Sequence, residues 1–162
     1  MDITECLNRA FTAHAETYEG WTNRETWAVS LWINNEEDMY RRSQTLINEN
    51  KYSAVDLATA LQEWFDDELL NTEIMDVEFV LKLRDEIGSF WRVEWIEIAR
   101  SFLADVPDRN LWEVYTTHRT VALYTEEELA EQEAVDGGFM YRKLTPEHAD
   151  YEIAVCTVGI TA

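Results

Sequence analysis

The chain has 162 residues, and its 33 Asp and Glu against 13 Lys and Arg give a formal net charge of −20. Apolar residues make up 46% of it, which is enough to build a core and argues against a disordered chain. The charge argues against direct binding to nucleic acid or to an anionic membrane, because both repel a negative surface.

The N-terminal part predicts helices. Residues 3–15 place Ile3, Leu7 and Phe11 at helical spacing, so a short first helix is expected. Gly20 interrupts this pattern. Thr22 is then expected to be an N-cap, because the Glu three positions later completes a capping box.

More helices are expected before Pro107, where the helical pattern ends. Their apolar residues recur every three or four positions, and Ser, Asp and Gly stand at the boundaries. They are expected at about 36–48, from the Ser53 cap to Leu69, at 76–87 with Gly88 as the stop, and from Ser89 to Pro107.

After Pro107 the sequence becomes rich in β-branched and aromatic residues. Strands are expected at 111–115, 120–124, 139–144 and 151–158, with a short helix between the second and third, opened by a capping box of Thr125 and Glu128. The fold class is therefore α+β. A helical domain, 1–107, is followed by a small ββαββ part, 108–162, which forms a separate domain or packs on the helices.

The sequence offers no pattern typical of a catalytic, metal or cofactor site. Cys6 and Cys156 are isolated, which indicates reduced thiols in a cytosol, and His14, His118 and His148 lack metal-ligand spacing. The N-terminus does not resemble a signal peptide, and no apolar run has membrane-spanning length. We expect a cytoplasmic protein that is not an enzyme, with no catalytic residues, no metal and no cofactor.

One carboxylate pattern supports an enzymatic alternative. Glu63 and Asp66 lie three residues apart on one expected helix, and Glu94 and Glu97 on another. Four carboxylates facing one another across a helical bundle would hold Mg²⁺, as in all-α nucleotide pyrophosphohydrolases. Because about one residue in five is acidic, such pairs also arise by chance, and solvated helix faces are the favoured interpretation.

The acidic residues themselves are the candidate site. Acids three or four residues apart on a helix stand about 5–6 Å apart between Cβ atoms, a scale comparable to the charges along a DNA strand. A rigid body of this kind would occupy the basic channel of a nucleic-acid-binding protein. The expected partner-binding residues are Glu36, Glu37, Asp38, Glu63, Asp66, Asp67, Glu68, Glu126, Glu127, Glu128 and Glu131.

The segment from Gly20 to Asn35 reads GWTNRETWAVSLWINN. It resembles a segment of an uncharacterised family of small proteins from phages, plasmids and archaeal mobile elements. The resemblance implies an accessory protein of a mobile element and assigns no site residues. The three Trp of the segment, Trp21, Trp27 and Trp32, are expected to pack in the core. In charge and size the chain is also similar to antirestriction and anti-CRISPR DNA mimics, with which it shares no motif.

These observations predict an acidic, nucleic-acid-mimicking inhibitor of a host defence complex. The expected partner is a basic nucleic-acid-binding protein, either a CRISPR effector or a restriction enzyme, and neither nucleic acid itself nor a membrane is expected to bind. Two alternatives remain: the Mg²⁺-dependent hydrolase and a structural accessory protein of a mobile element.

Overall fold

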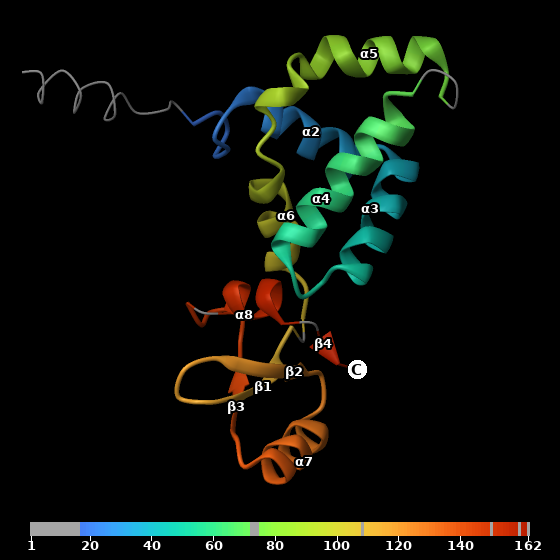
Figure 1. Cartoon of the computed structure of the whole chain (residues 1–162). Coiled ribbons are helices and arrows are strands. Elements are labelled where there is room, and N and C mark those ends of the chain that lie inside the picture. Colours follow the sequence, from blue (N-terminus) through green and yellow to red (C-terminus); the bar gives the residue numbers. More distant parts are fainter. Residues whose placement is uncertain (1–16, 72–74, 108, 150, 159, 162) are drawn as a thin grey trace, which may run out of the picture.

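A computed structural model describes residues 17–71, 75–107, 109–149, 151–158 and 160–161. The helix expected at 3–15, with His14 and Cys6, lies outside these residues. The fold class is α+β, as predicted: helices form the N-terminal part and a small sheet with two helices forms the C-terminal part (Figure 1).

The N-terminal part consists of five α-helices, a π-helical turn and a 3-10 turn within the described residues. In chain order these are α2 (Arg24–Asn35), α3 (Glu37–Glu49), α4 (Ala54–Trp64), the π-helical η1 (Phe65–Leu69), α5 (Val77–Ile87), the 3-10 turn η2 (Phe90–Arg92) and α6 (Trp95–Ala104). The helices predicted at 36–48, from Ser53 and at 76–87 are confirmed. Gly88 ends α5 with a φ of 88°, a conformation that favours glycine.

Two helix starts differ from the prediction. The N-cap of α2 is Asn23 and not Thr22: the Asn23 side chain accepts a hydrogen bond from the Thr26 backbone N–H. The helix predicted from Ser89 is divided, because the chain makes the turn η2 and begins α6 only at Trp95. Thr26 Oγ1 accepts the Glu94 N–H and so fixes this second start.

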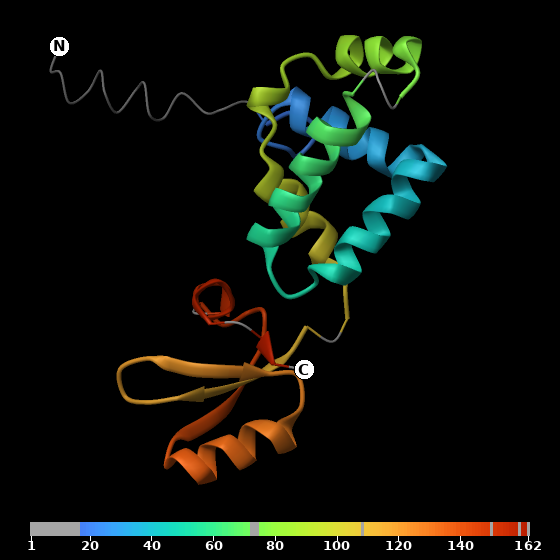
Figure 2. The ribbon, with the colours of Figure 1, turned by 45° about the vertical axis from the view of Figure 1, so that its right-hand side comes forward.

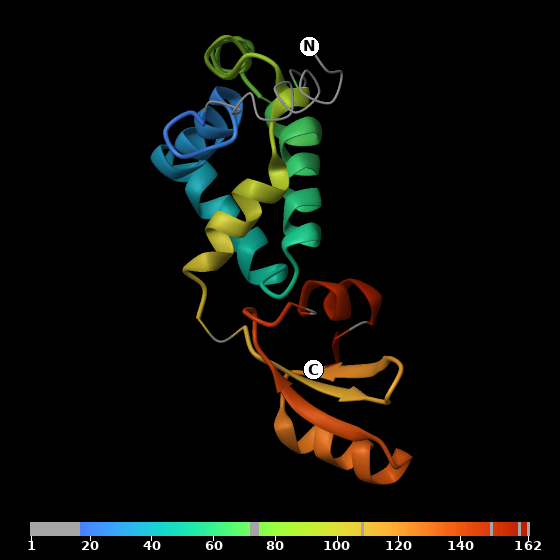
Figure 3. The same cartoon turned by 90° about the vertical axis from the view of Figure 1, so that its left-hand side faces the viewer.

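The C-terminal part is a four-stranded sheet between two helices (Figure 3). The strand order is β3-β1-β2-β4; β1 pairs antiparallel with β2 and β3, and β2 pairs parallel with β4. The elements are β1 (Leu111–Tyr115), β2 (Thr120–Tyr124), α7 (Glu127–Gly137), β3 (Met140–Leu144), α8 (Tyr151–Thr157) and β4 (Ile160–Thr161).

The strand predicted at 151–158 is wrong, because this segment forms α8. Tyr151, Ala154 and Val155 are buried, and their spacing is that of one helix face. They cover the apolar residues that the strands present on one side of the sheet, where Leu111, Leu123 and Leu144 are also buried. The capping box predicted at Thr125 is wrong as well, since α7 is capped at Glu126 without a side-chain bond.

The buried apolar residues form three clusters. The largest lies among the helices of the N-terminal part, and the other two lie on the two faces of the sheet, under α8 and under α7. Arg109 links the two parts, because its guanidinium donates to the carbonyls of Lys51 and Leu103 and its own carbonyl accepts from the Tyr151 hydroxyl. The division at residue 107 into separate domains stays a prediction.

Candidate functional site

The acids predicted at the start of α3 and at the end of α4 are brought together by the fold. Helices α3 and α4 run antiparallel, so the N-terminus of α3 lies beside the C-terminus of α4 and η1 (Figure 1). Arg42 on α3 lies 3.5 Å from a carboxylate oxygen of Glu68 on η1. We call the exposed acids here the α3/η1 group: Glu36, Glu37, Asp38, Glu63, Asp66, Asp67 and Glu68.

The turn η1 explains why three consecutive acids stay outside. Phe65 and Leu69 are buried in the large core, and Asp66, Asp67 and Glu68 between them are exposed. At the start of α3, Glu37 and Asp38 stand in the first turn, where the positive end of the helix dipole favours negative charge. Local structure therefore accounts for the acids in η1, which are turned outward, and for those in the first turn of α3, which the helix dipole stabilises.

Two arginines neutralise part of the α3/η1 group. Arg41 pairs with Glu37 and, at 3.8 Å, with Asp38, while Arg42 pairs with Glu68. These pairs are exposed and contribute about 0–1 kcal/mol each. Four acids of the group pair with no Lys or Arg in the part of the chain that the structure describes: Glu36, Glu63, Asp66 and Asp67. Seven carboxylates against two arginines leave the group strongly negative.

The remaining predicted acids lie on α7 and at its N-cap, Glu126, at the opposite end of the molecule (Figure 2). Ala130 and Ala134 are the buried residues of α7 and pack toward Val114 of β1, so the other faces of the helix meet solvent. The segment 126–138 holds six acids and no Lys or Arg. We call these acids the α7 group: Glu126, Glu127, Glu128, Glu131, Glu133 and Asp136.

Glu133 and Asp136 were missed by the prediction, although the acid-only composition of 126–138 is visible in the sequence. Asp136 accepts a hydrogen bond from Gln132. Glu133 is half-buried and faces Tyr124 of β2. Burial, and secondarily the Glu133 carboxylate, raise the pKa of Tyr124. All eleven predicted acids are exposed, but they form two separate groups and not one patch.

The four carboxylates of the hydrolase alternative are not assembled. Both carboxylate oxygens of Glu97 accept the Thr22 backbone N–H, at 3.1 and 3.2 Å, so this side chain holds the chain in front of α2. Within the described ranges, no three Asp, Glu, His or Cys side chains come close enough together to hold a metal ion. His118 and His148 are exposed and lie in different loops.

The Gly20–Asn35 segment uses its polar side chains to hold the chain between α5 and α6. Asn23 donates to the Arg92 carbonyl, Arg24 donates to the Glu86 carbonyl, and Glu25 forms an ion pair with Arg92. The core interpretation of its tryptophans is confirmed: Trp32 is buried, and Trp21 and Trp27 pack against the same cluster.

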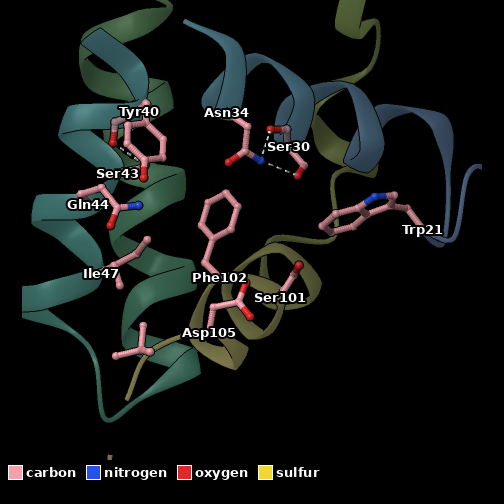
Figure 4. Close-up of a pocket in the computed structure, with 11 residues that line it drawn as sticks. Trp21, Ser30, Asn34, Tyr40, Ser43, Gln44, Ile47, Ser101, Phe102 and Asp105 are labelled. Atoms are coloured by element: carbon pink, nitrogen blue, oxygen red, sulfur yellow. Dashed lines mark hydrogen bonds between the residues drawn. The ribbon is translucent and has the colours of Figure 1, made fainter. Parts of the chain in front are cut away.

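On the other side of α2 the segment lines a cavity of about 400 Å³ (Figure 4). Trp21, Ser30 and Asn34 contribute to its wall, together with residues of α3 and α6. The sequence did not reveal this cavity, because its walls come from three elements that only packing brings together.

Comparison with known proteins assigns a family. A family of unknown function, DUF7249, matches residues 14–99, which are more than half of the chain. The protein belongs to this family. No curated protein and no solved structure matches the chain. The DUF7249 match contains the α3/η1 group and the Gly20–Asn35 segment, and it ends before the α7 group.

No helix in the described residues is both long enough and apolar enough to cross a membrane.

Proposed function

We propose that the protein acts by binding, as an acidic inhibitor that occupies the nucleic-acid-binding surface of a basic host protein. The target classes are CRISPR effectors and restriction enzymes, and the setting is a phage or another mobile element in the host cytosol. The observation that carries the proposal is α7 with its N-cap: six carboxylates and no Lys or Arg lie on the segment 126–138, and Ala130 and Ala134 pack the helix on the sheet.

The spacing on α7 suits this role. Glu127 and Glu131 are four residues apart and Glu128 and Glu131 are three apart, so their carboxylates stand side by side on the helix. A partner whose Lys and Arg bind the phosphates of a nucleic acid would find carboxylates on α7 at a spacing comparable to that of the phosphates. The charge of the whole molecule would also speed the encounter at low salt.

The α3/η1 group supports a second contact area. Because its acids come from α3 and from the α4/η1 segment, the distances between them depend on how these elements pack. Arg41 and Arg42 reduce the negative charge of the group. We expect it to contribute less than the α7 group, because a basic partner must compete with these arginines. The two groups lie at opposite ends of the molecule, so one extended groove or two copies of a partner would be needed to engage both (Figure 1).

The test is DNA cleavage by purified CRISPR effectors and restriction enzymes in the presence of the full-length chain. We expect inhibition of at least one enzyme at about 0.05 M NaCl and a loss of inhibition of tenfold or more, roughly, at about 0.3 M, because contacts between charges weaken with salt. Inhibition that is insensitive to salt would contradict charge mimicry, and no inhibition of any enzyme would reject the target classes.

A matched pair of variants separates the site from the total charge. The first replaces Glu126, Glu127, Glu128 and Glu131 by Gln. The control removes four exposed acids elsewhere, with the changes Glu49→Gln, Glu78→Gln, Asp85→Asn and Glu86→Gln. We expect the first variant to lose inhibition and the control to keep most of it. Equal losses would show that only net charge matters.

A further inference from the structure

The cavity beside the Gly20–Asn35 segment lies between α2, α3 and α6 and belongs to neither acidic group. Trp21, just before α2, stands on one side of it and Tyr40 of α3 on the other, and the Phe102 ring rises from α6 between them (Figure 4). Three aromatic rings therefore surround a cavity of about 400 Å³, a volume typical of sites for small molecules or single side chains.

Two side chains of the cavity wall, Asn34 and Ser43, present oxygen atoms that can accept hydrogen bonds. The Asn34 side-chain nitrogen donates to the Ser30 carbonyl, at 2.8 Å, so the amide cannot be turned around without placing two oxygens together. Its oxygen is thereby left for a ligand. Ser43 uses its hydroxyl hydrogen on the Tyr40 carbonyl, which leaves its oxygen as an acceptor as well.

The cavity is also negatively charged. Among the described residues that line it, Asp105 is the one carboxylate, and there is no Lys or Arg. In the described residues the Asp105 carboxylate has no ion pair or side-chain hydrogen bond. Asp105 is the C-cap of α6 and Asn34 lies in the last turn of α2, so two helix C-termini add their partial negative charge.

A ligand that engages the Asp105 carboxylate, the oxygens of Asn34 and Ser43, and the aromatic rings would carry positive charge, donate several hydrogen bonds and stack. A guanidinium group meets all three requirements, because it is planar, always charged and has five N–H donors. Stacking on Trp or Tyr adds a cation–π contribution. We propose that the cavity binds a guanidinium group, with Asp105 as its anionic partner and the rings of Trp21, Tyr40 and Phe102 as its walls.

The guanidinium group has two sources: a free small molecule, or an arginine side chain of a protein partner. The proposal goes beyond the acidic inhibitor described above and does not rest on it, since the cavity is built from other residues. Whether the cavity binds a guanidinium group can therefore be measured independently of whether the α7 group contacts a partner.

The experiment titrates the isotope-labelled full-length chain with two probes, agmatine and an acetylated Gly-Arg-Gly amide. It follows the resonances of Trp21, Asn34 and Gln44, a residue of α3 that also lines the cavity. The peptide with citrulline in place of arginine serves as the neutral control. We expect saturable shifts confined to the cavity with at least one guanidinium probe and none with citrulline. Binding of agmatine alone would identify a free ligand as the source, and binding of the peptide alone would identify an arginine side chain.

Two variants of equal charge decide whether Asp105 is the partner. We expect Asp105→Asn to weaken binding by about tenfold or more, the effect of losing a charge-assisted hydrogen bond. Asp85→Asn, at an exposed position of α5, should alter the affinity for the guanidinium probe by less than about twofold. Ser101 of α6 also lines the cavity, so the change Ser101→Leu, which adds volume there without altering charge, should abolish binding (Figure 4). Failure of both guanidinium probes to shift the cavity resonances, or equal weakening by both Asp changes, would overturn the proposal.

Discussion

At the scale of single residues, Glu113 shows how the protein stabilises a buried carboxylate. Its side chain is almost fully buried on β1, and both oxygens are used: one accepts from the Thr120 hydroxyl at 2.5 Å and the other from Arg142 Nε at 2.7 Å. A buried carboxylate is tolerated because it is both paired and hydrogen-bonded. Glu113 is therefore structural, in contrast to the four predicted acids of the α7 group, which are exposed.

We expect Glu113→Ala to lower the free energy of unfolding by about 2 kcal/mol. Removing one partner of a buried ion pair costs about 3–5 kcal/mol, and this is reduced here because Arg142 is partly exposed and water can solvate it. Urea denaturation measures the change. Glu126→Ala, at an exposed position, is the control and should change stability by less than about 0.5 kcal/mol. An equal effect of the two changes would contradict the structural role.

Tyr124 gives a prediction about pH. Its folded pKa is raised above the ordinary 10.0, first by burial and then by Glu133. A group with a raised folded pKa contributes stability that is complete below the unfolded value and is lost as pH rises through the folded value. We therefore expect stability to fall in alkaline solution above about pH 10.

The contribution of Glu133 can be isolated. Glu133→Gln should lower the pKa of Tyr124 but leave it above the ordinary value, since the burial remains. The tyrosinate absorbance of each protein, minus that of the same protein with Tyr124→Phe, measures this pKa. A pKa unchanged by Glu133→Gln would exclude the charge of Glu133 as a cause.

At the scale of elements, α2 is the organising helix of the N-terminal part. Its N-cap residue Asn23 accepts hydrogen bonds from the backbone and the hydroxyl of Thr26 and donates to the Arg92 carbonyl. One side chain therefore both caps α2 and holds η2 in place. The sequence predicted a cap here, but at Thr22, because Thr22 has a Glu three positions later and so fits the capping-box pattern, whereas Asn23 has Thr26 at that position and caps α2 without a box.

We expect Asn23→Ala to lower the free energy of unfolding by about 1–2 kcal/mol, the usual cost of losing an N-cap. The matched control is Asn48→Ala, at an exposed position of α3, which should have an effect below about 0.5 kcal/mol. Thermal and urea denaturation of both variants provide the comparison. If Thr22→Ala were the more destabilising change, the assignment of the cap would be incorrect.

At the scale of the whole molecule, the charge of −20 has a cost in stability. The acids of the α3/η1 and α7 groups and those of α5 repel one another across the surface, and this repulsion opposes the folded state. The proposed binding role would account for the retention of such a surface, because the same charges would attract a basic partner.

We expect the free energy of unfolding to rise by about 1 kcal/mol or more when NaCl is raised from about 0.1 M to about 1 M, because the Debye length falls from about 10 Å to about 3 Å. The variant with Gln at positions 126, 127, 128 and 131 should gain less stability from the added NaCl, since part of the repulsion between carboxylates has been removed. Stability that falls with salt would contradict self-repulsion as the dominant effect.

The sequence by itself determined the fold class, most helices, three of the four strands and the exposure of the eleven predicted acids. These follow from local periodicity and from the cost of burying a charge, which act within a few residues of the chain. Tertiary structure alone decided the helix α8, the joining of the two acid segments in the α3/η1 group, and the cavity between α2, α3 and α6. The residues 151–158 have an apolar pattern that fits a strand or a helix, and the uncovered face of the sheet selected the helix. The cavity and the α3/η1 group depend on how helices distant in sequence pack, and that information is carried by no single segment.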